Sequence, residues 1–282
     1  MPGTLFVVAT PIGNLEDITA RALRVLRESS LIAAEDTRRT SHLLARYAIT
    51  TPTTSLHEHN EAAKSAGIVE RLARGESVAL VSDAGTPTIS DPGRHLIRAA
   101  IDAGIKVEPV PGPDAAMAAL AVSGLPTESF LFMGFPPTRS TDRTMWFERA
   151  RSVGGTIVFF EAPHRVRQTL ADLQRAVGDQ DILVARELTK KHEELVRGPI
   201  SAVLAGLSEP VGEFTVVVSI GHTTEQHQTE PPPPAAILAE LGVMTKDSHL
   251  TKRAAISALA RRYGIGTNVV YQLVEAAKKS VE

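Results

Sequence analysis

Short apolar runs, each followed by turn residues, recur along the first part of the chain. Four of them predict buried strands, because they are short, apolar and rich in β-branched residues: residues 5–8, 31–34, 78–81 and 107–110. Apolar residues at helical spacing predict helices after the capping residues 17–19 and over 61–74 and 94–103. Residues 35–40 are polar and predict a turn. This alternation of strands and helices predicts a parallel sheet, and hence an α/β domain over residues 1–112.

Residues 113–221 predict a second α/β domain. An alanine-rich stretch, 113–125, predicts the helix that leads into it. Its expected strands are residues 130–133, 156–160, 181–185 and 214–220. The fold class expected for this part of the chain is therefore α/β, with two α/β domains that face one another.

The chain changes character after residue 221. Residues 222–234 are rich in His, Thr and Gln and end in a run of prolines, which predicts a linker stiffened by polyproline geometry. A small helical domain is expected over 235–282, with helices at 250–263 and 268–279 separated by Gly264-Ile265-Gly266, a pair that resembles a helix-turn-helix. The residues expected to face inward are Ala254, Ala255, Leu259, Ala260, Val269, Val270, Leu273 and Val274.

Basic residues of this tail support two interpretations. They contact nucleic acid, or they form the solvated face of a hairpin that docks or dimerises. They are Lys246, Lys252, Arg253, Arg261, Arg262, Lys278 and Lys279.

Composition narrows the class of protein. Cysteine is absent, which excludes disulfides, thiol nucleophiles and thiolate metal sites and fits a reducing cytoplasm. The first residues carry no basic segment and no small-residue cleavage site, so no secretory signal is expected, and no apolar run is long enough to span a bilayer. A net charge of −2 argues against a protein whose whole surface is basic and binds nucleic acid, but it is compatible with a local basic face.

Three loops at strand ends carry the candidate chemistry. Residues 9–14, 82–87 and 111–115 each follow a predicted strand, and ligands of α/β sheets bind beyond the carboxyl ends of the strands, so the loops predict one crevice. No loop contains a dinucleotide or triphosphate fingerprint or a basic residue, which favours a ligand with little negative charge. Asp83 and Asp114 can accept hydrogen bonds from ribose hydroxyls or an ammonium group. An adenosine that carries an amino acid and a cationic sulfur fits these properties.

His57-Glu58-His59 has the residue types of a metal site. It lacks a third partner at a characteristic spacing, so we expect a polar loop there and no metal.

Six segments resemble one known family in order and spacing. They include Ser-Asp-Ala-Gly-Thr-Pro-Thr-Ile-Ser-Asp-Pro-Gly at 82–93 and Phe-Glu-Ala-Pro-His-Arg at 160–165, and the others are 9–19, 34–38, 57–61 and 111–115. Together they resemble the small-subunit ribosomal RNA 2′-O-methyltransferase I family of tetrapyrrole methylase-like, class III S-adenosylmethionine enzymes. The resemblance covers about residues 4–221, and the tail resembles the small helical domain of many members.

The resemblance implies that the methyl donor, S-adenosyl-L-methionine, lies between the two α/β domains. The implied donor-binding residues come from the three loops and from later strands of the second domain: Pro11, Ile12, Gly13, Asp83, Ala84, Gly85, Thr86, Asp114, Ala115, Phe160, Glu161, Phe214 and Thr215. The family also implies methylation of a cytidine ribose in the decoding region of 16S ribosomal RNA, within the small ribosomal subunit, by a cytoplasmic homodimer.

The catalytic base is not identified by the sequence. A ribose hydroxyl needs a base or an electrostatic stabiliser, and the polar strand ends offer Glu35, Asp36, Glu161, His164, Glu187 and Lys191 without favouring any of them. Basic residues near the expected entrance are candidates for RNA phosphates: Arg38, Arg39, Arg139, Arg143, Arg165, Arg167, Lys190 and Lys191.

Two alternatives to RNA methylation stay open. One is a methyltransferase acting on a tetrapyrrole, because the fold class is shared, although a basic tail favours a polyanion. The other is a non-catalytic RNA-binding factor of ribosome assembly that retains the donor pocket.

Overall fold

The computed structural model describes residues 2–207, 211–221, 234–247, 251–263 and 267–279. The chain divides into two compact units, Met1–His222 and Thr223–Glu282. No helix among the described residues is long and apolar enough to cross a membrane.

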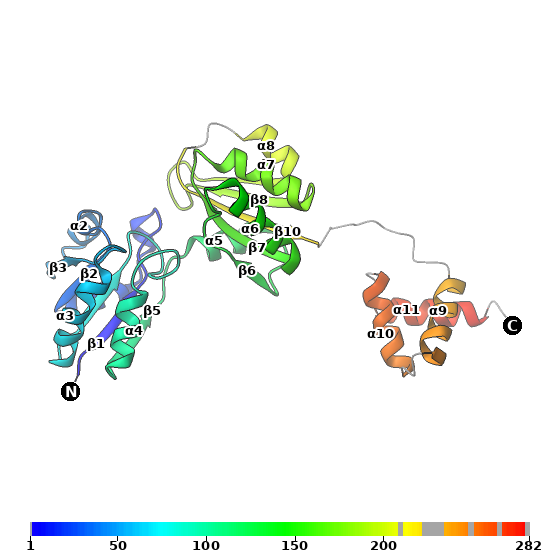
Figure 1. Ribbon diagram of the computed structural model, residues 1–282, viewed down its shortest axis with the longest axis horizontal. Helices are drawn as coiled ribbons and strands as arrows, with labels where there is room; N and C mark the ends of the chain where they lie inside the picture. Colours follow the sequence, from blue (N-terminus) through cyan, green and yellow to red (C-terminus); the bar gives the residue numbers. More distant parts are fainter. Residues whose placement is uncertain (1, 208–210, 222–233, 248–250, 264–266, 280–282) are drawn as a thin grey trace. The chain divides into compact units, whose positions relative to one another are not determined.

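The first sheet is parallel throughout (Figure 1). Its order is β3-β2-β4-β1-β5. The strands are β1 (Thr4–Val8), β2 (Leu31–Ala34), β3 (Thr53–Ser55), β4 (Val78–Val81) and β5 (Lys106–Val110). All their carboxyl ends therefore meet at one edge, where the three candidate loops begin.

Helices cover both faces of this sheet because successive strand residues point to opposite sides. Ala79 and Val81 pack with α1 (Ala20–Glu28) and α2 (Thr37–Arg46), after the short 3₁₀ helix η1 (Leu15–Asp17). Val78 and Leu80 pack on the other side with α3 (Glu61–Ala73) and α4 (Arg94–Asp102). Four-residue strands that are buried along their whole length explain the continuous apolar runs of the sequence.

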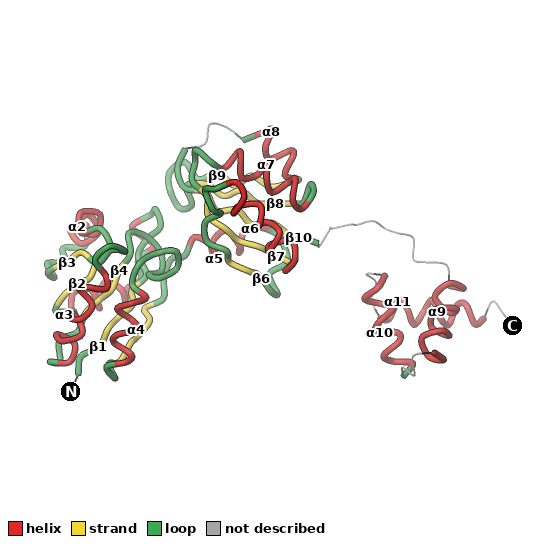
Figure 2. The backbone as a smooth tube through the Cα atoms, in the orientation of Figure 1, coloured by secondary structure: helices red, strands yellow, loops and turns green. Residues whose placement is uncertain are grey.

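The second sheet is mixed, in the order β6-β7-β10-β8-β9 (Figure 2). Only β6 and β7 pair in parallel among its neighbours. The strands are β6 (Phe130–Phe132), β7 (Gly155–Glu161), β8 (Asp181–Arg186), β9 (Glu194–Pro199) and β10 (Phe214–Ile220). The last strand of the unit, β10, thus occupies the middle of the sheet.

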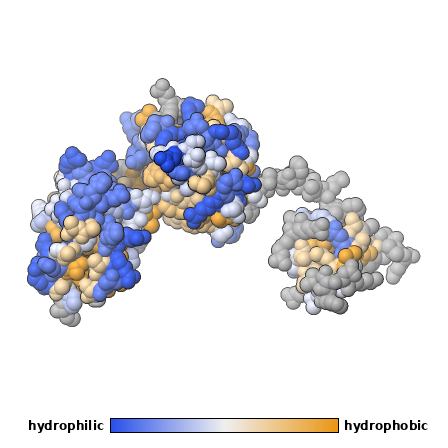
Figure 3. Space-filling view, in the orientation of Figure 1, coloured by the Kyte–Doolittle hydropathy of each residue, from blue (hydrophilic) through white to orange (hydrophobic). Residues whose placement is uncertain are grey.

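One face of the second sheet packs against three helices and the other face against one. The three are α6 (Ser140–Val153), α7 (Val166–Val177) and α8 (Ile200–Gly206), and the single helix is α5 (Ala115–Ser123). Hydrophilic residues predominate over much of the face of this unit seen in Figure 3, as expected for helices whose apolar sides are turned to the sheets.

The unit Thr223–Glu282 has a core of its own. It is built from α9 (Pro234–Asp247), α10 (Lys252–Tyr263) and α11 (Thr267–Lys279) around residues such as Ile237, Leu259 and Val270. The Tyr263 hydroxyl donates to Glu240 Oε1 at 2.6 Å. The predicted helix pair is therefore part of a bundle that includes a third helix, α9.

The predicted strands and helices are confirmed, with the following corrections. The predicted polar turn at 35–40 is wrong, because Asp36 accepts the Arg38 backbone N–H and caps α2, which begins at Thr37. Strands β3 and β9 and helices α2, α6, α7, α8 and α9 were not predicted. Ala254 and Val269, expected to face inward, are exposed. Of the predicted linker over 222–234, residues 222–233 lie outside the described residues and Pro234 begins α9; the glycine turn at 264–266 also lies outside them.

Candidate active site

The three candidate loops meet at the carboxyl edge of the first sheet. Thr10 and Gly85 exchange two backbone hydrogen bonds of 2.9 Å, which fasten the first loop to the second. The third loop lies against the first, since a Cβ on Gly112 would be 3.1 Å from Ala9 Cβ. Gly85 has φ +74°, a conformation that favours glycine. The prediction of a single crevice is confirmed.

This crevice is a cavity of about 400 Å³ that both sheets line. Such a volume is typical of a small-molecule site. The lining residues are Ile12, Glu35, Arg39, Asp83, Ala84, Gly85, Thr86, Ile89, Ser90, Asp91, Asp114, Ala115, Phe135, Phe160, Glu161, Ala162, Pro163, Glu213, Phe214 and Thr215.

Every predicted donor-binding residue lines the cavity except Pro11 and Gly13, among the residues described. Gly13 instead lies against the loop after β8, where a Cβ would be 2.5 Å from Lys190 Cγ and 2.7 Å from Thr189 Oγ1. The backbone N–H of Asn14 donates to Thr189 Oγ1 at 2.9 Å. Glycine is needed at position 13 because a strand-end loop of the first sheet and a loop of the second approach so closely there.

Several lining residues were not predicted as donor contacts. Ile89, Phe135 and Glu213 were not singled out, although Phe135 follows β6 and Glu213 directly precedes β10. Phe135 is 53% exposed and packs against the ring of Phe160, with centroids 5.5 Å apart. The position of Phe135 and Glu213 next to predicted strands was the available signal, and it does not tell which of several neighbouring residues faces a cavity.

Carboxylates crowd one part of the cavity wall. The backbone N–H of Asp36 donates to Asp83 Oδ1 at 3.0 Å, and that of Asp83 donates to Glu35 Oε2 at 3.3 Å. Arg39 Nη1 is 3.3 Å from Asp83 Oδ2. Burial raises the pKa of Glu35, and the nearby Asp83 charge adds to this effect.

Asp91 faces the same group of charges. Burial raises its pKa to about 6, and the negative charges of Glu35 and Asp83 act in the same direction, against the lowering effect of the nearby Ser82 hydroxyl. This wall of the cavity therefore favours a cationic ligand over an anionic one.

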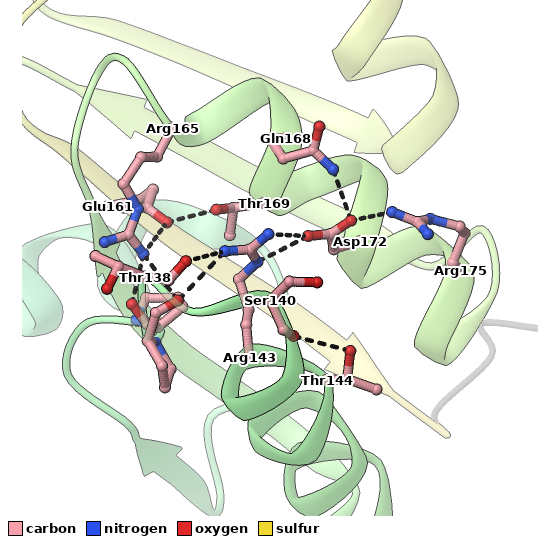
Figure 4. Close-up of polar contacts among 12 residues, drawn as sticks. Thr138, Ser140, Arg143, Thr144, Glu161, Arg165, Gln168, Thr169, Asp172 and Arg175 are labelled. Atoms are coloured by element: carbon pink, nitrogen blue, oxygen red, sulfur yellow. Dashed lines mark hydrogen bonds and ion pairs between the residues drawn. The ribbon is translucent and has the colours of Figure 1, made fainter.

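Glu161, one of the residues that line the cavity, forms a largely buried ion pair with Arg165 (Figure 4). Glu161 Oε2 accepts from Thr169 Oγ1 at 2.5 Å and from Arg165 Nη2 at 3.2 Å. Arg165 also donates to the backbone carbonyls of Pro136 and Pro137. Its guanidinium therefore holds the loop that carries Phe135 against the start of α7, although Arg165 was predicted to contact RNA.

Arg143 has a similar structural position. It forms an ion pair of 2.6 Å with Asp172 and donates to the carbonyl of Thr138, and it is almost fully buried (Figure 4). This contact ties the same loop to α6 and α7.

The other predicted RNA-binding residues differ in how accessible they are. Lys190 is half-buried between Glu187 and Glu213, and these carboxylates raise its pKa although burial opposes the shift. Lys191 is exposed. Arg38 is exposed and pairs with Asp36, whose pKa it lowers, and Arg39 is exposed at the cavity. Four more candidates fall on α10 with side chains outside the described part: Lys252, Arg253, Arg261 and Arg262.

Metal-ligating side chains do not gather in groups of three or more within the described ranges. His57 and His59 contact each other edge to face, and His57 Nε2 lies 2.9 Å from the Asn60 side-chain amide.

Comparisons with known proteins identify the family. A model of the tetrapyrrole (corrin/porphyrin) methylases matches residues 4–204. Ribosomal RNA small subunit methyltransferase I of Pseudomonas aeruginosa is 42% identical over 96% of this chain and 96% of its own. The chain belongs to the ribosomal RNA small subunit methyltransferase I group of this methylase family. The protein of the same name from Halalkalibacterium halodurans is 47% identical to this member over 77% of the chain and 75% of its own length.

Solved structures share the fold of this methylase family member. Diphthine synthase has a TM-score of 0.61 at 16% identity, over 77% of this chain and 90% of that one. Uroporphyrin-III C-methyl transferase from Thermus thermophilus, complexed with S-adenyl homocysteine, has a TM-score of 0.54 at 18% identity, over 77% and 97%. The fold expected from the resemblance is therefore confirmed.

Proposed function

We infer that the protein transfers a methyl group from S-adenosylmethionine to ribosomal RNA of the small subunit. The observation that carries this inference is the composition of the cavity at the ends of β1, β4 and β5. Its carboxylates suit a sulfonium and an ammonium group, and its apolar residues, Ile12, Phe160 and Phe214, suit an adenine ring. The donor supplies a methyl carbon that its positively charged sulfur has already activated.

We assign eleven of the thirteen predicted donor residues to two groups, and the other two an indirect role. Those of the loops hold the amino acid and ribose, with Asp83 and Asp114 as hydrogen-bond acceptors. Phe160, Glu161, Phe214 and Thr215 lie on the side of the cavity built from β7 and β10, where they support the adenine. Pro11 and Gly13 act indirectly, by fixing the path of the loop that carries Ile12.

The chain's contribution to methyl transfer is mainly positioning. An in-line displacement needs the acceptor oxygen held opposite the leaving sulfur, and a rigid wall of loops fastened by backbone hydrogen bonds can supply that geometry. Carboxylates of the cavity wall favour binding of the positively charged donor.

At finer detail, we propose that the acceptor is the 2′-hydroxyl of a cytidine ribose in the decoding region, and that the protein is a cytoplasmic homodimer. These points rest on the resemblance described for the sequence. We also keep the division at residues 112 and 113 between two α/β domains as a proposal, because each sheet has its own core.

A tetrapyrrole methyltransferase is the second candidate, since solved relatives of that kind share the fold. A polycarboxylate tetrapyrrole would add negative charge beside Glu35, Asp83 and Asp91, whereas a ribose is neutral. The relatives with 40–47% identity are named for ribosomal RNA. Both observations favour RNA.

The test is to incubate the protein with methyl-labelled S-adenosylmethionine and unmodified small subunits, naked 16S RNA or a tetrapyrrole precursor. We expect label at one ribose of 16S RNA, which makes that phosphodiester bond resistant to alkali. Label in the tetrapyrrole alone would overturn the proposal, and donor binding without any transfer would favour an assembly factor. Light scattering of the same sample measures the subunit number.

A further inference from the structure

We propose that Asp91 is the general base that removes the proton from the hydroxyl group that is methylated. The inference rests on the proposed function and adds the residue that activates the acceptor. A hydroxyl is a weak nucleophile at neutral pH, and a carboxylate at the reacting centre can take its proton as the new bond forms. The carboxylates that line the cavity are Glu35, Asp83, Asp91, Asp114, Glu161 and Glu213.

Two of these carboxylates are held by cations. Glu213 accepts from Lys190 Nζ at 3.3 Å, and Asp83 pairs with Arg39 as well as accepting a backbone N–H. A fixed positive charge or N–H group stabilises the ionised form of a carboxylate and so reduces its tendency to take a proton.

Two others already have structural partners. Both oxygens of Glu161 accept hydrogen bonds, one from its neighbour Ala162 and the other from Thr169 and Arg165. Asp114 Oδ1 accepts the Met117 backbone N–H at 3.0 Å and caps α5. Removing either carboxylate from these contacts would cost the hydrogen bonds that position it.

Glu35 and Asp91 remain, and their surroundings differ. Glu35 accepts the backbone N–H of Asp83, and Arg39 also stabilises its ionised form. Within the described part of the chain, the one donor group near the Asp91 carboxylate is the Ser82 hydroxyl, which donates to the Ala84 carbonyl at 3.1 Å, and the negative charges of Glu35 and Asp83 face Asp91. Asp91 is therefore the lining carboxylate with the strongest tendency to accept a proton while still ionised at neutral pH.

The backbone around Asp91 has an unfavourable conformation. Thr88 and Ser90 have φ of 74° and 68°, which is unfavourable for residues with a Cβ. Gly93 has φ +125°, and a Cβ there would be 2.8 Å from Leu80 Cδ2. Such strain persists where surrounding structure imposes it, and it gathers at functional sites. The segment between β4 and α4 thus fixes the Asp91 carboxylate at the cavity.

The step balances as follows. The Asp91 carboxylate takes the hydroxyl proton while an electron pair of the hydroxyl oxygen forms the bond to the methyl carbon. The carbon–sulfur bond breaks and its electron pair stays on sulfur, which becomes a neutral thioether. Asp91 then releases the proton to water.

The decisive variant is Asp91→Asn, which keeps the size of the side chain but cannot take the proton. We expect kcat for methyl transfer to small subunits to fall by about 10²–10⁴-fold, and the dissociation constant of S-adenosylmethionine, measured by calorimetry, to rise far less than kcat falls, because only one of the six carboxylates that line the cavity is lost. The matched control is Asp102→Asn, an exposed residue of α4 that pairs with Arg98 and should leave kcat unchanged. Asp91→Glu should recover part of the rate.

Two further measurements do not depend on turnover of the variant. Titration of the Asp91 carboxyl carbon by NMR should give a pKa of about 6 in the wild-type protein, and kcat of the wild type should fall below that pH. Three results would overturn the inference: a variant rate within about fivefold of wild type, a donor affinity that falls as much as the rate, or titration near 4. A wild-type protein that labels no RNA would instead overturn the proposed function.

Discussion

Replacing Arg165 by alanine should lower the stability of the part of the protein that contains the second sheet, rather than remove a contact to RNA. Arg165 was predicted from the sequence as a phosphate ligand, but its guanidinium is bound by the buried Glu161 and by the carbonyls of Pro136 and Pro137. The variant leaves a fully buried carboxylate without its cation and releases the loop that carries Phe135.

The size of the effect follows from the burial of the pair. Breaking a buried ion pair by removing one partner costs about 3–5 kcal/mol. Glu161 keeps its contacts with Thr169 and with the backbone of Ala162, and a fifth of the Arg165 side chain is exposed, so we expect the lower limit of this range, about 3 kcal/mol. For a unit of this size that corresponds to a fall of roughly 6–12 °C in the melting temperature.

The single tryptophan of the sequence provides the assay. Trp146 packs against Phe147 and Phe159 in the core of the second sheet, so its fluorescence reports the unfolding of this part. The control is Arg151→Ala, which removes an exposed pair with Glu148 on α6 and should change the melting temperature by less than about 2 °C.

A second substitution separates the ion pair from other effects. Glu161→Gln removes the buried charge, so adding Arg165→Ala to it should cost clearly less than Arg165→Ala costs alone. The reasoning would be refuted if Arg165→Ala kept the wild-type melting temperature and instead weakened RNA binding with a reduced salt dependence.

The remaining predictions concern stability, packing and substrate binding. Asp91→Asn should raise the free energy of unfolding at pH 8 by about 1 kcal/mol, after allowance for solvent screening of a half-buried group, and by almost nothing at pH 4. The sign follows because the folded protein binds the proton of the Asp91 carboxyl group more tightly than the unfolded chain does, so ionisation of Asp91 lowers the stability of the wild type as pH rises from about 4 through 6. Urea unfolding of both proteins at pH 4 and pH 8 measures this difference. A variant less stable than the wild type at pH 8 would contradict the reasoning. Gly13→Ala should lower the free energy of unfolding, measured in urea, by about 1–3 kcal/mol because the added Cβ meets Lys190. Gly67→Ala in α3, where an added Cβ would meet no other atom within 4 Å, should leave the free energy of unfolding unchanged or raise it. Phe135→Ala should weaken the apparent affinity for RNA substrate by about 5–100-fold without changing donor affinity, as expected if the exposed ring stacks on a base; an equal loss of donor affinity in calorimetry would place the ring against adenine instead.

Much of the fold was predictable because three of its described strands, β2, β4 and β10, are buried along their whole length. Residues 31–34 and 78–81 form strands with the predicted bounds, since a short, fully apolar run between turn residues has few other uses. Strands β3 and β9 escaped prediction because Thr53–Ser55 is short and polar, and Glu194–Pro199 contains glycine and proline.

The cavity was predictable on its loop side and less so on the other. Gly85 and Asp83 lie in loops that directly follow parallel strands, and parallel strands must bring such loops together. Phe135 depends on the path of a loop that Arg143 and Arg165 fasten, and no local pattern reports that contact. The same long-range contacts explain why Arg143 and Arg165, predicted to contact RNA, are instead largely buried against carboxylates and backbone carbonyls.

The central place of β10 in the second sheet has a consequence during protein synthesis. Residues 214–220 leave the ribosome after β7 and β8, so these two apolar strands each expose an edge until the last strand arrives between them. A nascent chain that stops before residue 214 therefore lacks the centre of the sheet as well as Phe214 and Thr215 of the cavity wall. Insertion of β10 therefore completes the cavity wall and covers the exposed edges of β7 and β8 in the same late step of folding.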